Sequence, residues 1–236
     1  MRHSHATFRR IARYANTLCV LAAAATLLLS GCTRDVDGNL LESSELRAAH
    51  STSAAMPTTT PPPAKPISLD SLVRSSVRTS ALFWQTLGIN VDVEPRAVNE
   101  LTCAGSTSPG SSAIFCPTTT FDLVKYDPAL LNQRRANGGD LAVRIVMAHE
   151  VGHAAHYVDG SNSFKGGNDE LVADCAAGAA LADAGVDRND AKTAIRATAL
   201  GAKDSGYGIS GEQRTGAFFD GFDGTISPMG CLSYTG

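Results

Sequence analysis

Apolar positions recur with helical spacing along much of the chain after residue 66, and this pattern predicts a domain in which helices predominate. Residues 90–102 and 112–126 are expected to form short strands, and the alternation over 118–126 is typical of a hairpin arm or an edge strand. The pattern therefore predicts an α+β fold, mainly helical, with a small sheet. The expected helices cover 67–87, 128–135, 140–157, 168–184, 188–203 and a segment that begins at Ser210.

Small polar residues and glycines mark several of the expected helix ends. The stretch 137–139, Asn-Gly-Gly, ends one predicted helix, and Asp140 caps the long helix that follows it. Asn168 caps the next helix, and residues 210–213 have the capping-box pattern of serine followed three residues later by glutamine.

The first 31 residues are typical of an export signal. Four arginines among the first 13 residues precede an apolar stretch from about Leu18 to Leu29 and then small residues. That apolar run is shorter than the about 20 residues that a membrane-spanning helix needs. The sequence from Leu29 to Cys32 resembles the lipobox of bacterial lipoproteins, in which the cysteine is lipidated. We therefore expect a lipoprotein signal peptide over 1–31 and a membrane tether at Cys32.

The composition after the signal separates a linker from a folded domain. Residues 32–66 are rich in threonine and proline and cannot bury a core, so they are expected to form a disordered, extended spacer. The folded domain is expected over 67–236. Without residues 1–31 the chain has 16 basic and 23 acidic residues, which gives no reason to expect nucleic acid as a partner. The expected location is the bacterial cell envelope, with the domain lipid-anchored on the extracytoplasmic side.

Four cysteines remain in the expected domain, and they favour two disulfides. We favour the pairing of Cys103 with Cys116, which closes a short loop, and of Cys175 with Cys231, which joins the C-terminus to a helix. A zinc site made of four thiolates is the rival interpretation, but the sequence has no Cys-x-x-Cys pair.

The predicted helix 140–157 is apolar on nearly every side, which is typical of a buried helix, yet it carries His149, Glu150 and His153. Burying these polar groups without partners would cost several kcal/mol, so something must satisfy them. At about 100° per residue the two histidines lie within about 40° of each other on one face. Both imidazoles can therefore bind one metal ion, with Glu150 beside them, which is the physical content of the His-Glu-x-x-His motif.

A catalytic zinc ion needs three protein ligands and an open position for water. Glu170, in the first turn of the next predicted helix, is the best candidate for the third ligand, with Asp169 or Asp159 next. Asp174 lies one turn further and faces the same way, so it can accept the second ring N–H of a ligand histidine. His156 stands about a turn too far along to be a ligand and is interpreted as lining or structural.

These motifs resemble the neutral zinc metallopeptidase family. The resemblance covers roughly residues 100–234, most of the expected domain, and it implies a zincin-like peptidase with His149, His153 and Glu170 on zinc and Glu150 as the catalytic base. The matching segments are 139–142, 148–153 and 170–178, with 115–117 upstream, 210–214 near the end, and Cys231 beyond.

The sequence also departs from the family pattern. The family usually has a histidine where this chain has Ala154, a glutamine in place of His156, and His-Gly before the segment 211–214. No histidine follows His156 in this chain. Tyr207 and Arg214 are therefore the candidates for stabilising the transition state, although Arg214 could equally form a salt bridge at a helix end.

The resulting hypothesis is a zinc-dependent endopeptidase with one zinc ion per chain, acting on a peptide or protein substrate with Glu150 as general base. The competing hypothesis is a non-catalytic lipoprotein that keeps the zincin fold as a binding or scaffolding module. A third hypothesis, a structural zinc ion only, would require four protein ligands and no water on the metal.

Overall fold

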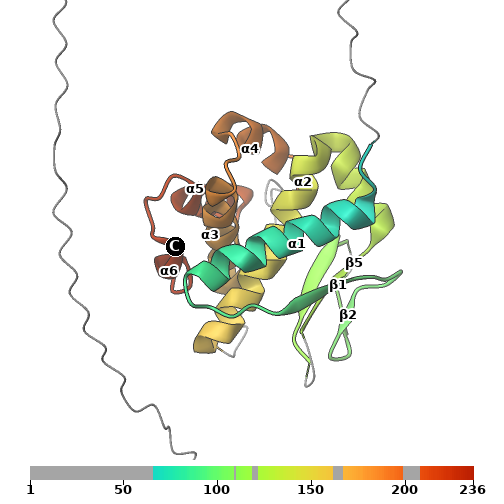
Figure 1. Cartoon of the computed structure of the whole chain (residues 1–236), viewed down its shortest axis with the longest axis horizontal. Coiled ribbons are helices and arrows are strands. Elements are labelled where there is room, and N and C mark those ends of the chain that lie inside the picture. The colour runs from blue at the N-terminus through green and yellow to red at the C-terminus, as the bar shows by residue number, and fades with distance from the viewer. Residues whose placement is uncertain (1–65, 109, 119–121, 162–166, 199–207) are drawn as a thin grey trace, which may run out of the picture. The chain divides into compact units, whose positions relative to one another are not determined.

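The computed structural model describes residues 66–108, 110–118, 122–161, 167–198 and 208–236 (Figure 1). The helices are α1 (Leu69–Thr86), α2 (Pro128–His156), the π-helical turn η1 (Tyr157–Ser161), α3 (Gly167–Asp183), α4 (Arg188–Ile195), α5 (Gly211–Phe222) and α6 (Pro228–Cys231), and the strands are β1 (Val93–Ala97), β2 (Thr102–Cys103), β3 (Ser106–Thr107), β4 (Ala113–Cys116) and β5 (Asp122–Tyr126). The prediction of a mainly helical domain with a small sheet is confirmed. The predictions for 1–65, Cys32 among them, and for Tyr207 lie outside the described residues.

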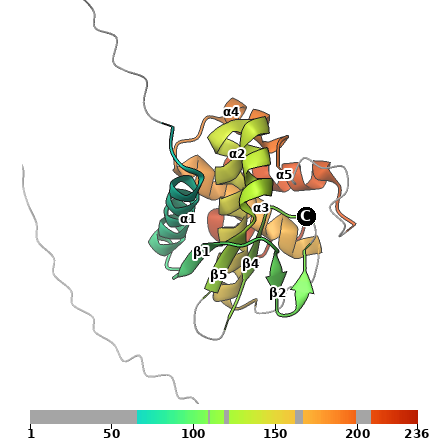
Figure 2. The same cartoon turned by 90° about the vertical axis from the view of Figure 1, so that its right-hand side faces the viewer.

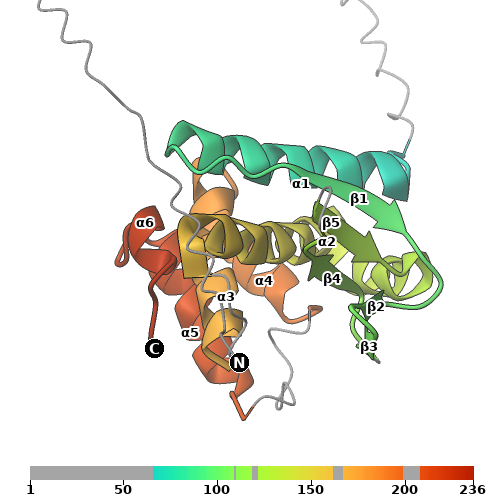
Figure 3. The same ribbon diagram turned by 90° about the horizontal axis from the view of Figure 1, so that it is seen from below.

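Helix α2 lies at the centre of the domain and contacts α1, α3, α4 and β4 (Figures 1 and 2). Ser68 caps the N-terminus of helix α1, where its hydroxyl accepts a hydrogen bond from the N–H of Ser71. The helix lies along α2 (Figure 3). Its inward face buries Leu72, Val73 and Trp84 completely. None of the helices in the described part of the chain is long and apolar enough to cross a membrane.

The main sheet has the order β1-β5-β4, with β5 parallel to β1 and antiparallel to β4. The alternative of an edge strand for 118–126 is therefore wrong, because β5 is the central strand. The reason is visible in Leu123 and Val124, which point to opposite faces of the sheet and are both buried. Strands β2 and β3 form a separate two-stranded antiparallel ribbon.

The two helices predicted over 128–157 are joined into α2 with a kink at Gly139, whose φ of 69° and ψ of −170° are not helical. Only glycine adopts such a backbone readily, so the predicted break is in the right place. The predicted gap between two separate helices, over 136–139, is wrong, since the non-helical backbone of Gly139 is enough to redirect one continuous helix. Asp140 pairs with Arg135 across the kink at 2.7 Å.

Helix α4 ends at Ile195, so the predicted helix over 188–203 is too long. The N–H of Ala197 turns back to the carbonyl of Ala194, and the hydroxyl of Thr198 donates to the carbonyl of Ile195 at 2.6 Å. These bonds satisfy carbonyls that a continuing helix would have used. At the start of α5, by contrast, the predicted capping box of Ser210 and Gln213 is present.

Both predicted disulfides are present. Cys103–Cys116 joins β2 to β4, and Cys175–Cys231 joins α3 to α6. The second one attaches the C-terminal helix to α3 one residue after Asp174.

Helices α3 and α5 pack with their backbones unusually close together, because each presents a glycine to the other. A Cβ atom on Gly178 would overlap the carbonyl of Phe218, and one on Gly221 would overlap the carbonyl of Cys175. The small residues therefore bring α5, and with it Arg214, close to α3.

Replacing Gly221 with alanine is expected to destabilise the protein by at least about 1–3 kcal/mol, because the added methyl group forces two backbones apart. Gly216→Ala is the matched control on the same helix, since a Cβ atom there meets nothing within 4 Å and the better helix former should add up to about 1 kcal/mol. Urea unfolding of both variants measures the difference. Equal stabilities would contradict the close approach of α3 and α5.

Candidate metal centre

The buried part of α2 presents His149 and His153 on successive turns of one face. Both residues are 7% exposed, and their ring centroids lie 4.6 Å apart. The two Nε2 atoms are 3.1 Å from each other. The neighbouring residues Ala148, Val151 and Ala154 are fully buried, so the core surrounds this part of α2.

Glu170 on α3 faces both histidines. One of its carboxylate oxygens lies 3.4 Å from Nε2 of His149, and the other lies 3.5 Å from Nε2 of His153. The three side chains together form a group whose ligand atoms could hold one metal ion.

Gly152, inside the motif, makes this approach of α3 to α2 feasible. A Cβ atom on Gly152 would lie only 2.8 Å from the carbonyl oxygen of Ala173. A larger residue there would push α3 away and with it the carboxylates of Glu170 and Asp174. The glycine thus has a geometric role that sequence analysis did not assign to it.

Asp174 is completely buried and lies on the other side of His149, with Oδ1 2.8 Å from Nδ1 of the ring. A carboxylate in this position favours a proton on Nδ1, which leaves Nε2 to face the metal position.

Arg214 on α5 closes the site from a third helix. Its side chain is buried, and its guanidinium holds Asp174 through two bonds, from Nε at 2.7 Å and from Nη2 at 2.9 Å. Nη2 also lies 2.9 Å from Glu170 Oε2 and 3.5 Å from Nε2 of His149. Of the two roles considered for Arg214, the salt bridge near a helix end is present, since Arg214 lies close to the start of α5 and pairs with Asp174 and Glu170, but the bridge is buried in the site.

Glu150 is buried on the same helix, and its carboxylate accepts the backbone N–H of Phe115 on β4 at 2.6 Å. The bond fixes one carboxylate oxygen of Glu150 against the sheet. Segment 115–117 belongs to the family resemblance, but no pattern in the sequence indicated that Phe115 bonds to Glu150, because a backbone donor carries no residue signature.

The electrostatics of the group follow from burial and from its crowded charges. Burial alone lowers the pKa of His149, but the carboxylates of Asp174 and Glu170 outweigh it and raise the pKa to about 10. Burial raises the pKa of the Glu170 carboxyl, but the hydrogen bonds with both histidines lower it well below its usual range. Without a metal ion, therefore, a proton on His149 supplies part of the positive charge that the carboxylates require.

The other acidic and histidine residues near the motif lie outside this group. The ring of His156 lies between the carbonyl of Leu232, 2.9 Å from Nδ1, and Asp169, 3.4 Å from Nε2. This arrangement agrees with a structural role for His156 and places Asp169 away from the ligand position. Asp159, on η1, is exposed.

The donor set fits zinc. Two ligand atoms bound at about 2.0–2.1 Å to a tetrahedral ion are about 3.3–3.4 Å apart. The distances from Nε2 to Nε2 and from each Nε2 to a Glu170 oxygen, 3.1, 3.4 and 3.5 Å, are close to that spacing. The formal charges agree as well. The carboxylates of Glu150, Glu170 and Asp174 and the guanidinium of Arg214 together leave two net negative charges, which one divalent cation would neutralise.

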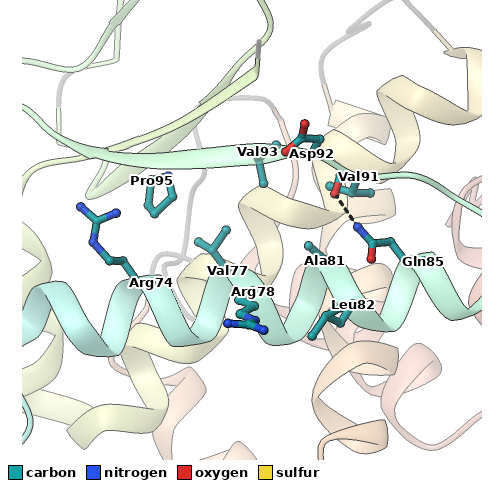
Figure 4. A pocket seen from close by; sticks show the side chains of 10 residues that line it. All are labelled: Arg74, Val77, Arg78, Ala81, Leu82, Gln85, Val91, Asp92, Val93 and Pro95. Atoms are coloured by element: carbon teal, nitrogen blue, oxygen red, sulfur yellow. Dashed lines mark hydrogen bonds between the residues drawn. The ribbon is translucent and has the colours of Figure 1, made fainter.

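A separate pocket of about 260 Å³ lies between α1 and residues 91–95 (Figure 4). Arg74 and Gln85 line it, but Arg74 is paired with Asp70 on its own helix, and Gln85 donates to the carbonyl of Val91. None of the predicted site residues lines this pocket, so the candidate chemistry of the described residues is at the metal centre.

Comparisons with protein-family models, with curated proteins and with solved structures found no match for this chain.

Proposed function

We propose that this protein is a zinc-dependent endopeptidase in which His149, His153 and Glu170 hold the metal ion and Glu150 is the general base. The observation that carries the proposal is that two histidines on α2 and one carboxylate on α3 converge. The two Nε2 atoms are 3.1 Å apart, and each lies 3.4 or 3.5 Å from a different oxygen of Glu170, spacings close to those of ligands on one zinc ion. A zinc ion bound there would supply a Lewis acid for the scissile carbonyl and would acidify a water molecule.

Glu150 would take the proton from the attacking water and return it to the leaving amine. Its carboxylate suits this role because the N–H of Phe115 holds one oxygen in place, so that proton transfer needs little rearrangement. Asp174 would keep His149 in the tautomer whose Nε2 faces the ion.

The proposed substrate is a peptide or protein outside the cytoplasm. The two disulfides support an oxidising compartment. The proposed signal peptide and the lipid on Cys32 would hold the domain at the membrane surface of the bacterial cell envelope.

Chelator-sensitive proteolysis tests the proposal. The purified protein should cleave a denatured protein such as casein, stop when 1,10-phenanthroline removes the metal, and recover when zinc is added back. Stoichiometric zinc without any cleavage would favour the competing hypothesis, a zincin fold kept as a binding or scaffolding module. Cleavage that survives removal of the metal would contradict the metal's role in catalysis.

A further inference from the structure

Arg214 is the permanently charged buried cation of the metal centre, and it contacts three of the groups that define the site. Only 5% of Arg214 is exposed. Three of its N–H vectors are accounted for by carboxylates, two on Asp174 and one on Glu170. These are three of the five N–H groups of the guanidinium, and they place Arg214 to hold the carboxylates of Asp174 and Glu170.

The charges of the site explain why such a cation is needed. Glu150, Glu170 and Asp174 place three formal negative charges in a largely buried volume. Buried carboxylates are costly unless a counter-charge and hydrogen bonds compensate them. Arg214 supplies one positive charge permanently, because a guanidinium does not lose its proton in a protein.

The position of Arg214 also brings it into competition with a metal ion. Its Nη2 lies 2.9 Å from Glu170 Oε2 and 3.5 Å from His149 Nε2, two atoms that face the proposed ion. Since those atoms would each be about 2 Å from zinc, Nη2 lies within about 5.5 Å of the metal position. Two cations that share one carboxylate at such a distance repel each other strongly in a partly buried site.

We propose that Arg214 is a positioning residue that acts as the internal counter-ion of the centre. It holds Asp174 and Glu170 in place when no metal is bound, and it opposes the metal energetically once the metal arrives. The inference rests on the proposed function only in requiring that a divalent cation binds between His149, His153 and Glu170. It does not depend on whether the bound protein hydrolyses peptides.

The test measures zinc affinity and metal-free stability in Arg214→Met and Arg214→Lys. Methionine removes the charge, so the melting temperature without metal should fall by about 4 °C or more, while zinc should bind about tenfold more tightly or better, as is usual for coupled sites. Lysine keeps the positive charge but cannot form the paired hydrogen bonds of the guanidinium to Asp174. It should therefore also lower the melting temperature, but leave zinc affinity closer to that of the original protein. Affinity is measured by competition with a chromophoric zinc chelator, and melting is followed with EDTA and with saturating zinc.

Arg188→Met is the matched control, because Arg188 forms a similar two-bond fork with Asp223 but on the surface. It should leave zinc affinity unchanged. If Arg214→Met weakens zinc binding, or lowers the melting temperature equally with and without zinc, Arg214 has a purely structural role and the proposal is wrong. A methionine variant that stays unfolded at saturating zinc would also contradict it, since the metal should replace the missing charge. Failure of the original protein to bind zinc would instead overturn the proposed function.

Discussion

Replacing Glu150 with glutamine is expected to lower peptide hydrolysis by about 10²- to 10⁴-fold, the usual contribution of a general base. The amide oxygen of glutamine can still accept the N–H of Phe115, so the side chain should keep its position against β4. What it loses is the ability to take a proton. Because Glu150 is not one of the three proposed ligands, the zinc content and the melting temperature should change little.

The matched control for this variant is Glu212→Gln, on the first turn of α5, where the side chain is exposed. Initial rates on a fluorogenic peptide and zinc content by mass spectrometry give the two readouts. Undiminished hydrolysis by the zinc-loaded Glu150→Gln protein would remove Glu150 from the mechanism.

Replacing Glu170 with alanine is expected to weaken zinc binding by more than about 100-fold. The loss of a residue that only supports a ligand through a hydrogen bond costs up to about 100-fold, and Glu170 is itself a proposed ligand. The substitution removes the only ligand that α3 contributes to the proposed triad. Asp174→Ala should have a smaller effect, about 10- to 100-fold, because it removes the partner of His149 and leaves all three ligands in place.

The order of these two effects is the informative result. Asp183→Ala, at the exposed end of the same helix, serves as the control and should leave zinc affinity unchanged. Glu170→Gln repeats the test with a side chain of the same shape, in case alanine disturbs Arg214. Unchanged zinc affinity in both Glu170 variants would place the third ligand elsewhere.

The sequence was sufficient to predict the features that depend on local rules. The break at Gly139 and the capping box at Ser210 follow from backbone preferences of neighbouring residues, and both are present. The disulfide pairs follow from loop length and spacing, and both are present as well. The buried character of the second half of α2 was readable from its apolar residues on every side.

Features that depend on contacts between distant segments were not predictable in the same way. The central position of β5 is set by its pairing with β1, about 30 residues away, and periodicity within β5 does not report that pairing. The length of α4 is set by bonds of Ala197 and Thr198 that compete with helix propensity. The bond from Phe115 to Glu150 joins residues from a strand and a helix without any spacing motif.

Within the candidate site, the sequence indicated which residues carry chemistry but not how they share charge. Arg214 was a candidate for two different roles, because the residues around it in the sequence do not indicate which side chains it contacts in the folded domain. Its burial against Asp174 and Glu170 depends on the close packing of α3 and α5 at Gly178 and Gly221.

X-ray absorption at the zinc edge of the zinc-loaded protein tests the central claim most directly. The account predicts one zinc ion per chain with four ligands: two imidazole nitrogens at about 2.0–2.1 Å, a carboxylate oxygen and a solvent oxygen, with no sulfur. A sulfur shell near about 2.3 Å, a third imidazole, or failure to retain stoichiometric zinc would contradict it.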